Sequence, residues 1–228
     1  MMRFTSLERA GLGVAVISDK TDGDCGSRPE MRANVQAFLE RSGRLPRRLV
    51  RLRQVHGNRV VEAGGLGDTP GMDPVEADGM FTDEPGIALG ISVADCAPVM
   101  LYDPLRRVIA ALHAGREGTL CNIAAAGVHA LAERFACSPA SLLAVVGPCA
   151  GPCCYEVSPE CAERWRAAGL PACHRHLDLG TANRMQLEKA GLIRHNIEVV
   201  PHCTVCGGVF FSYRAGEISN RNLVVMML

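Results

Sequence analysis

Three residues of the metal-binding types His and Cys stand at the margins of strand-like apolar segments. His56 precedes Gly57, Cys96 opens an apolar run, and His113 closes another run just before Gly115. A thiolate and two imidazoles supply three of the four positions around a tetrahedral zinc ion and leave the fourth open for water or substrate. No short spacing forces these residues together, so three unrelated strand ends remain an alternative at this point.

The segments before the first histidine predict a helix and a pair of strands. Ser27 with Glu30 forms a capping-box pattern, and an apolar stripe from Met31 predicts a helix ending near Gly43. Residues 49–55 form a strand-like run, 56–58 a turn, and the apolar pair from Val60 begins a partner strand. His56 is therefore expected at a strand end.

The rest of the chain alternates strand-like and helix-like segments. Strands are predicted around residues 87–93, 98–102, 108–112, 142–146, 197–200, 209–213 and 223–227. Helices are predicted over 119–135, from Ser158 onward, and after a cap at Asp178 or Thr181, and a loop over the glycine-rich residues 64–74. We predict an α+β fold in which residues 1–228 form a single layered domain of mixed β-sheets flanked by helices.

Composition excludes several classes of partner. The 228 residues carry 24 basic and 24 acidic side chains, a formal net charge of +0, and only 4% aromatics, which argues against nucleic acid and anionic membranes. No apolar run approaches the ~18 residues of a membrane span. The odd count of 11 cysteines in a long chain predicts reduced thiols in a cytoplasmic protein. A small-molecule substrate is expected, and a monomer is compatible with the sequence, which does not fix the oligomeric state.

Other candidate motifs are weaker. The chain contains no P-loop, no H-E-x-x-H and no H-x-E, and residues 90–94 miss the last glycine of the serine-hydrolase elbow. Cys203 and Cys206 form a C-x-x-C that the adjacent pair Cys153 and Cys154 would have to complete. Because neighbouring cysteines seldom chelate one tetrahedral ion comfortably, we predict ordinary buried or reactive thiols there rather than a structural zinc site.

Several longer motifs occur in a fixed order. They are QVHG at 54–57, ADG at 77–79, ADC at 94–96, HAG at 113–115, GPCCYEV at 151–157, the DL-x3-N-x2-QL stretch at 178–187, and CT followed by FFSYR near the C-terminus. Together they resemble the YfiH/LACC1 family, also known as laccase-domain or peptidoglycan-editing proteins. The resemblance implies a YfiH-like (cysteine-hydrolase-like) fold and a Zn2+ ion, with Cu2+ as an alternative, held by His56, Cys96 and His113 as ligands and catalytic residues.

The resemblance also implies a reaction. It points to phosphorolysis of adenosine, inosine and methylthioadenosine, with purine nucleoside and phosphate as small-molecule substrates, and to adenosine deamination. A metal lowers the pKa of its bound water toward neutrality, which suits attack at C6 of adenosine. Asp95 is a candidate for orienting a ligand or for acid–base work, and a structural cap is an equal alternative.

The sequence departs from the family pattern beside the site. The family usually reads HAGWRG, whereas this chain reads HAGREG, so Arg116 stands in place of Trp and Glu117 in place of Arg. A carboxylate near the site repels phosphate where a guanidinium would hold it. Phosphorolysis is therefore expected to be weakened unless Arg116 turns inward. Ala215 also replaces a second Arg expected after FFSYR.

Alternative functions use the same residues differently. Cys96 as nucleophile with His113 as base would make an amidase-type hydrolase acting on peptidoglycan precursors. Two imidazoles and one thiolate also resemble a copper site of a phenol oxidase. A trinuclear laccase cluster, however, needs more imidazoles than the 7 histidines supply. A non-catalytic metal-binding module would need a fourth protein ligand, and the sequence nominates none nearby.

Overall fold

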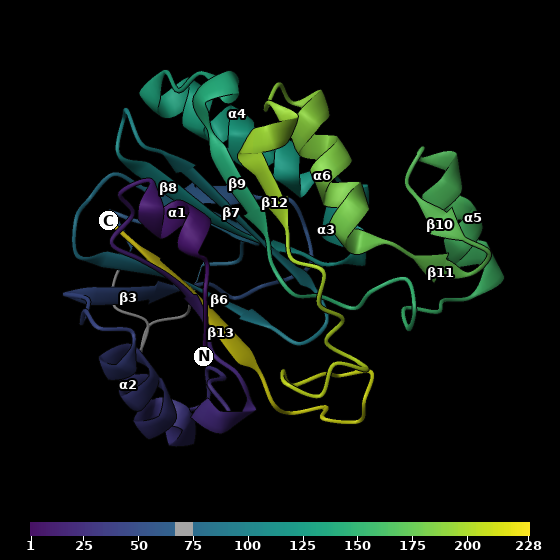
Figure 1. Cartoon of the computed structure of the whole chain (residues 1–228), viewed down its shortest axis with the longest axis horizontal. Coiled ribbons are helices and arrows are strands. Elements are labelled where there is room, and N and C mark those ends of the chain that lie inside the picture. Colours follow the sequence, from purple (N-terminus) through teal and green to yellow (C-terminus); the bar gives the residue numbers. More distant parts are fainter. Residues whose placement is uncertain (67–74) are drawn as a thin grey trace.

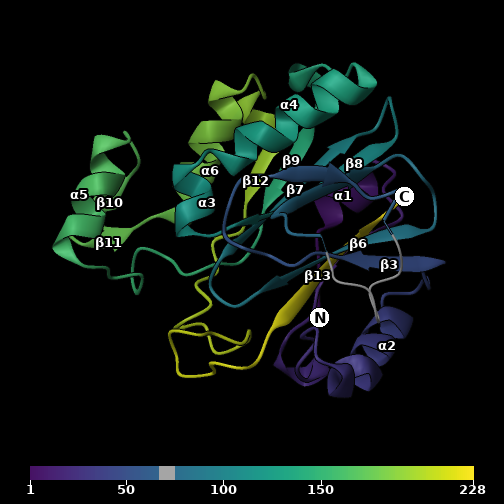
Figure 2. The ribbon, with the colours of Figure 1, turned by 180° about the vertical axis from the view of Figure 1, so that it is seen from behind.

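Two β-sheets lie face to face, and helices cover their outer faces (Figures 1 and 2). The structure is a computed structural model that describes residues 1–66 and 75–228. Most of the predicted loop at 64–74 therefore lies outside the described residues. The expected α+β class with mixed sheets is confirmed.

One sheet has five strands in the order β1-β2-β13-β6-β3. These are β1 (Met2–Arg3), β2 (Val14–Ile17), β13 (Asn222–Met227), β6 (Ile87–Val93) and β3 (Arg48–Arg51). β3 is parallel to β6, whereas the other pairs are antiparallel.

The second sheet has six strands in the order β12-β9-β7-β8-β5-β4. These are β12 (Ile197–Val199), β9 (Leu143–Val146), β7 (Ala97–Asp103), β8 (Val108–Ala114), β5 (Gly79–Thr82) and β4 (Val60–Glu62). β7, β8 and β5 run antiparallel at its centre, and the two edge pairs are parallel.

The central strands are almost entirely apolar because both of their faces are buried. Leu89 of β6 and Met100 of β7 point into the core between the sheets. Their neighbours point outward: Leu101 packs under the helices α4 (Ile123–Phe135) and α6 (Leu179–Lys189), and Ala88 packs near Phe38 of α2 (Arg32–Arg41). Burial on both sides explains why these runs do not alternate with polar residues.

Shorter elements complete the described chain. These are α1 (Thr5–Arg9), α3 (Arg116–Leu120), α5 (Pro159–Ala167), the two-stranded pair β10 (Ala172–Cys173) and β11 (His176–Leu177), and the 3-10 turns Lys20–Asp22, Pro29–Met31, Pro139–Ser141 and Arg194–Asn196. Trp165 of α5 is fully buried. Among the described residues, no helix has the length and apolar character needed to cross a bilayer.

Several predicted elements differ from the structure. The Ser27 capping box does not form, because the chain makes a 3-10 turn at Pro29–Met31 and no side-chain cap is present there. The helix expected over 119–135 is split by the left-handed Asn122 into α3 and α4. The strand expected at 209–213 is irregular, since its N–H groups bond to side chains: Phe211 donates to Asn222 Oδ1 and Ser212 to Glu217 Oε2.

Candidate functional site

The three predicted site residues come together at one end of the sheet sandwich. The donor atoms of His56, Cys96 and His113 all lie within 4.8 Å of one another. The two imidazole rings meet edge to face, with their centroids 4.8 Å apart. His113 is buried, Cys96 half-buried and His56 exposed, so the group opens outward through His56.

The register of two strands places Cys96 beside the end of β8. β7 begins at Ala97, whose partner in the ladder is Ala114 of β8, and Pro98 pairs with His113. The residue before β7 and the last residues of β8 must therefore meet at the same edge. This pairing brings Cys96 and His113 together although 17 residues separate them.

His56 arrives where the chain passes from one sheet to the other. β3 belongs to the five-stranded sheet and β4 to the six-stranded sheet, so the predicted pairing of these strands is wrong. The crossing bends at His56, whose φ of 63° is left-handed. β6 and β7 also lie in different sheets, and their connection contains Cys96. The site is thus built where two crossings share one end of the sandwich.

Asp78 holds the His56 turn and orients His113. Its carboxylate accepts the backbone N–H groups of Val55, His56 and Gly57 at 3.2, 2.9 and 2.7 Å. The same carboxylate contacts Nδ1 of His113 at 2.8 Å, and its side chain is fully buried. A hydrogen bond at Nδ1 fixes the imidazole and leaves Nε2 as the donor atom for a metal.

Asp78, in the ADG motif, was assigned no role from the sequence. Gln54, in the QVHG motif, was also missed, and it binds both main-chain groups of Ser92 at 2.8 Å. That pair of bonds ties the chain before His56 to β6. Both Asp78 and Gln54 are polar residues that lie in a family motif next to a strand-like segment. That combination is the sequence signal that could have identified them.

The charges in the site favour a thiolate. Burial acts to raise the pKa of Cys96, but His113 and then His56 outweigh it and bring that pKa to about 6. Burial opposes the charged form of His113, but Cys96 and Asp78 raise its pKa to about 9. Without a metal the site holds an ion pair, and the same soft and borderline donor set fits a zinc or copper ion.

Gly115 leaves space for this donor set. A Cβ atom at this position would lie 2.9 Å from Cys96 Sγ, closer than real Cβ atoms come, and 3.1 Å from His56 Cδ2, tighter than most real Cβ contacts. The HAG motif therefore needs glycine for close approach rather than for an unusual φ. The backbone turns there into the short helix α3, which begins at Arg116.

The Gly115→Ala variant is expected to lose about 10- to 100-fold in metal affinity, because the added methyl displaces two of the three donors. Metal titration followed by native mass spectrometry measures this. Gly65→Ala is the matched control, since a Cβ there meets no atom of the described residues within 4 Å. Equal metal affinity in the Gly115→Ala and Gly65→Ala variants would show that His56, Cys96 and His113 do not bind one metal ion together.

Asp95 has a structural position next to Cys96. Its left-handed φ of 84° turns the chain, and its Oδ1 accepts the Thr204 hydroxyl at 2.6 Å. Its Oδ2 accepts the Arg214 N–H at 2.8 Å. The carboxylate thus fastens the irregular segment before β13 to the site, which supports the cap alternative over acid–base work.

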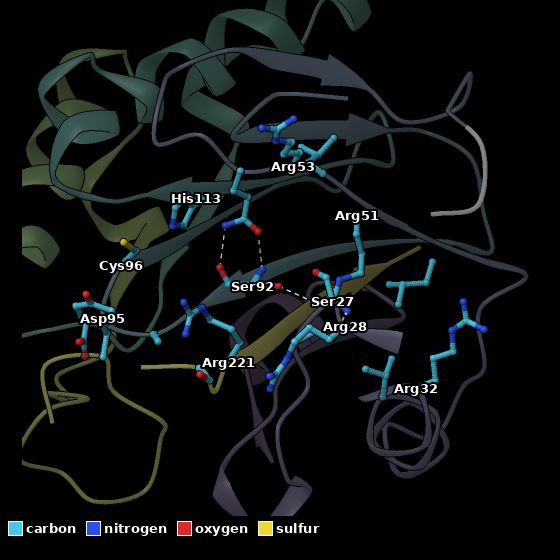
Figure 3. A pocket seen from close by; sticks show the side chains of 18 of the residues that line it. Ser27, Arg28, Arg32, Arg51, Arg53, Ser92, Asp95, Cys96, His113 and Arg221 are labelled. Carbon is cyan, nitrogen blue, oxygen red and sulfur yellow. Dashed lines mark hydrogen bonds between the residues drawn. The ribbon is translucent and has the colours of Figure 1, made fainter. Parts of the chain in front are cut away.

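A cleft of about 1460 Å3 opens from the three donors along the five-stranded sheet (Figure 3). Nine arginines and two carboxylates occur among the described residues that line it. Figure 3 shows Cys96, His113 and Asp95 at one end of the cleft and Arg28, Arg51 and Arg221 further along. A concave surface of this charge favours an anionic ligand, although the chain as a whole has no net charge.

The two residues that depart from the family pattern form an ion-pair group. Arg116 Nε donates to Glu117 Oε1 at 2.9 Å, and Arg164 binds the other carboxylate oxygen. Burial acts to raise the pKa of Glu117, but hydrogen bonds from Arg116 and Arg164 outweigh it and lower that pKa. Two guanidinium groups therefore offset the carboxylate that the sequence suggested would repel phosphate.

The DL-x3-N-x2-QL motif supports α3 from behind. Asp178 caps α6, as one of the two predicted caps, by accepting the N–H of Thr181 at 2.9 Å. From α6, Asn183 Nδ2 donates to the Thr119 hydroxyl at 3.1 Å and Gln186 Nε2 donates to the Thr119 carbonyl at 2.6 Å. These buried bonds fix the helix that carries Arg116.

Comparison with known proteins gives the class. Residues 21–228 match the family described as "Multi-copper polyphenol oxidoreductase laccase". The crystal structure of the Bacillus licheniformis hypothetical protein YfiH superposes with a TM-score of 0.84 at 28% identity, covering 94% of this chain and 92% of that one. The fold and the sequence match agree over most of the chain.

Two curated relatives carry the name purine nucleoside phosphorylase. SCO2081 of Streptomyces coelicolor is 37% identical over 197 residues, 83% of this chain and 78% of that protein. LACC1 of Mus musculus is 28% identical over 187 residues, 77% of this chain but 42% of that protein. This chain therefore aligns with less than half of the mouse protein. The chain belongs to the YfiH/LACC1 family of laccase-domain proteins.

Proposed function

We propose that the chain is a zinc-dependent purine nucleoside phosphorylase that cleaves adenosine, inosine and methylthioadenosine and also deaminates adenosine. The observation that carries this proposal is the position of the three donors at the end of an arginine-lined cleft. The names of the relatives SCO2081 and LACC1, both purine nucleoside phosphorylase, support the same reaction class. We further propose that the protein works in the cytoplasm, where its thiols stay reduced.

His56, Cys96 and His113 would hold the metal, and their donor types fit it. Among the described residues no fourth ligand lies with them, so one position remains for a substrate or water. When bound, zinc supplies a Lewis acid that polarises a ligand oxygen and lowers the pKa of water. Asp78 keeps His113 in the tautomer that leaves Nε2 free to bind.

The chain's own residues provide for an anion and an aromatic base. Arg116 and Arg214 line the cleft close to the donors, and guanidinium groups suit phosphate oxygens. The Arg214 guanidinium also lies over Tyr155, 4.8 Å from the ring centroid, which restricts its motion. Tyr213 is 54% exposed in the same cleft and offers a face for a purine ring.

The two proposed reactions leave different products. In phosphorolysis a phosphate oxygen bonds to the ribose C1′ as the bond from C1′ to the purine nitrogen breaks, and the purine leaves with a proton. In deamination a water oxygen bonds to C6 and the amino group leaves as ammonia. Incubating metal-loaded protein with adenosine, inosine and methylthioadenosine, with and without phosphate, separates them by chromatography and ammonia assay. Absence of both product sets would overturn the proposal.

We expect Arg116→Ala to lower phosphate-dependent cleavage of inosine about tenfold, mainly through the KM for phosphate, because one charged hydrogen-bonding partner is lost. Phosphate-independent release of ammonia should change little. Arg164→Ala is the matched control, since it removes the other partner of Glu117. Glu117→Arg should raise phosphate-dependent cleavage. If neither Arg116→Ala nor Glu117→Arg changes the phosphate dependence, this loop does not bind phosphate.

A second candidate function rests on the ion pair between Cys96 and His113. In the absence of metal, a Cys96 thiolate of lowered pKa beside an imidazolium is the arrangement of a cysteine hydrolase of amide bonds, including those of peptidoglycan precursors. A thiolate bound to zinc is a poor nucleophile. Activity that rises when metal is removed and falls when it is restored would favour the hydrolase. Metal-dependent phenol oxidation with copper would favour the oxidase alternative.

A further inference from the structure

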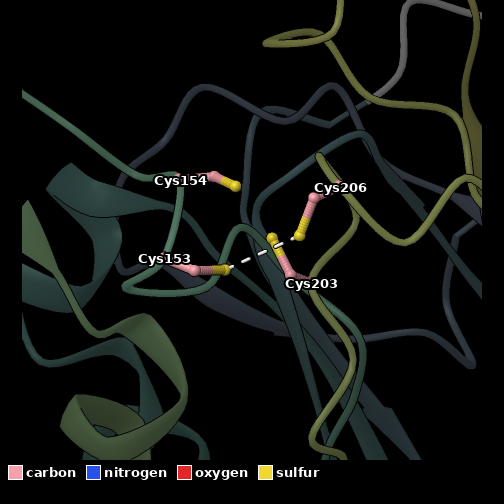
Figure 4. A group of neighbouring side chains, drawn as sticks. All are labelled: Cys153, Cys154, Cys203 and Cys206. Carbon is pink, nitrogen blue, oxygen red and sulfur yellow. Dashed lines mark hydrogen bonds between the residues drawn. The ribbon is translucent and has the colours of Figure 1, made fainter.

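Four cysteines outside the donor group form a second cluster on the described surface (Figure 4). Cys153 and Cys154 follow β9, and Cys203 and Cys206 follow β12. All four sulfur atoms lie within 4.8 Å of one another, and the sulfurs of Cys153 and Cys206 are 3.7 Å apart. Sulfurs bound to one tetrahedral zinc at about 2.3 Å lie about 3.8 Å apart, so the spacing is close to that of a shared ion.

The backbone explains how neighbouring cysteines both reach the cluster. The chain turns tightly at Gly151, whose carbonyl accepts the N–H groups of Cys154 and Tyr155, both at 2.9 Å. Figure 4 shows the side chains of Cys153 and Cys154 extending from this turn toward the other pair. The turn therefore removes the objection, raised from the sequence, that adjacent cysteines chelate one ion poorly.

Main-chain hydrogen bonds hold the two pairs opposite each other. The Thr204 N–H donates to the Cys149 carbonyl at 3.0 Å, and the Cys149 N–H donates to the His202 carbonyl at 3.4 Å. Within the segment that carries Cys203 and Cys206, the Gly207 N–H donates to the Cys203 carbonyl at 3.0 Å and closes a turn. These backbone contacts place the two pairs opposite each other.

The cluster also has the outer contacts of a metal thiolate. The N–H of Gly151 points at Cys203 Sγ, 3.3 Å away, as expected for an N–H group that stabilises a ligating sulfur. A Cβ on Gly151 would lie 3.2 Å from Cys203 Cβ and 3.5 Å from Cys153 Sγ, so the turn passes close to both pairs. All eleven cysteines are free in the structure.

We propose that Cys153, Cys154, Cys203 and Cys206 together bind a structural Zn2+ ion through their four thiolates, at a site separate from the His56–Cys96–His113 donors. Four thiolates around one ion form a closed site with no position for substrate, and tetrahedral coordination by four sulfurs is typical of zinc. Each thiol gives its proton to solvent as a zinc–sulfur bond forms, so the step needs no oxidant. This reverses the sequence prediction of ordinary thiols.

The site clamps a segment that forms one wall of the cleft. Residues 201–221 contain no helix or strand apart from an isolated bridge, so few regular hydrogen bonds hold them. This segment carries Thr204 and Arg214, which bind the two carboxylate oxygens of Asp95, one residue before Cys96. A zinc ion joining this segment to the turn after β9 would fix that wall and the chain leading into Cys96.

The experiment counts zinc by native mass spectrometry on full-length protein purified with reductant and zinc. The deciding comparison is between the single variant Cys96→Ala and the double variant Cys96→Ala with Cys206→Ser. Cys96→Ala removes a donor of the His56–Cys96–His113 site, so that the zinc still bound reports on the four cysteines. We expect about one zinc per chain in Cys96→Ala and none in the double variant. Cys96→Ala with Cys173→Ser is the matched control, since Cys173 is also exposed, and it should keep its zinc.

A second measurement keeps the test decisive if a variant is poorly folded. In Cys96→Ala, chelation of zinc should lower the Tm by more than about 4 °C, and added zinc should restore it. Cobalt should replace the ion and give the charge-transfer absorption of a tetrathiolate. Three results would each overturn the assignment of a four-cysteine zinc site. The first is a Cys96→Ala protein without zinc whose four thiols are reactive, the second is bound iron in place of zinc, and the third is disulfides among these cysteines that persist under reductant. None of these readouts depends on nucleoside cleavage.

Discussion

Cys96→Ala is expected to remove the metal held by the three donors and to lower nucleoside phosphorolysis by more than about 100-fold. The reason is that loss of a direct donor should exceed the effect of losing an outer partner, which is about 10- to 100-fold. Cys96 supplies the sulfur that faces both His56 and His113. Metal content by native mass spectrometry and phosphate-dependent release of the purine base from inosine measure the two effects.

Cys137→Ala is the matched control for this prediction. Cys137 is only 5% exposed and lies in the core under the helices. It belongs neither to the His56–Cys96–His113 donors nor to the four-cysteine cluster. Its loss should cost stability without changing metal content or the KM for inosine. A Cys96→Ala protein that keeps full activity at the wild-type metal content would exclude both the metal and the nucleophile roles of this cysteine.

Asp78→Ala is expected to lower the free energy of unfolding by about 3 to 5 kcal/mol and to weaken metal binding about 10- to 100-fold. Its buried carboxylate accepts three backbone N–H groups and binds Nδ1 of His113. Alanine leaves these part-buried N–H groups and the buried His113 ring without their acceptor and frees the imidazole to rotate. Urea unfolding and metal titration measure the two effects separately.

Asp103→Ala provides the comparison for Asp78. Asp103 is 1% exposed, and its Oδ1 accepts the N–H groups of Leu105 and Arg106 in the turn between β7 and β8. It lies at the opposite end of β7 from Cys96. This variant should also lose stability but should bind metal normally. If both aspartate variants lost metal equally, global destabilisation rather than the His113 contact would be the cause.

Some of the fold follows from local patterns because those patterns are physically strong. The runs at 87–93, 98–102, 108–112 and 142–146 form β6, β7, β8 and β9, with boundaries close to those predicted. Strands buried on both faces must be apolar throughout, and turn residues separate them. The helix predicted from Ser158 onward is α5, and the Ser158 side chain accepts the N–H of Cys161 at its start.

Other expectations failed where a side chain replaced a regular backbone partner. The strand expected at 209–213 does not form because Asn222 and Glu217 accept its N–H groups. The partner of the strand at 49–55 was wrong because strand pairing depends on distant segments. β3 lies against β6 in one sheet, and β4 lies against β5 in the other. The sequence around each strand does not reveal which distant strand it pairs with.

The sequence by itself determined the residue types of the site, the α+β class and, through the order of its motifs, the family. Only the tertiary structure decided that His56, Cys96 and His113 meet, because two sheet crossings and the β7–β8 register bring distant residues to one edge. The same holds for the four cysteines, which a turn at Gly151 and backbone bonds to 202–204 bring together. Residue type is a local property, whereas convergence depends on long-range hydrogen bonding and packing.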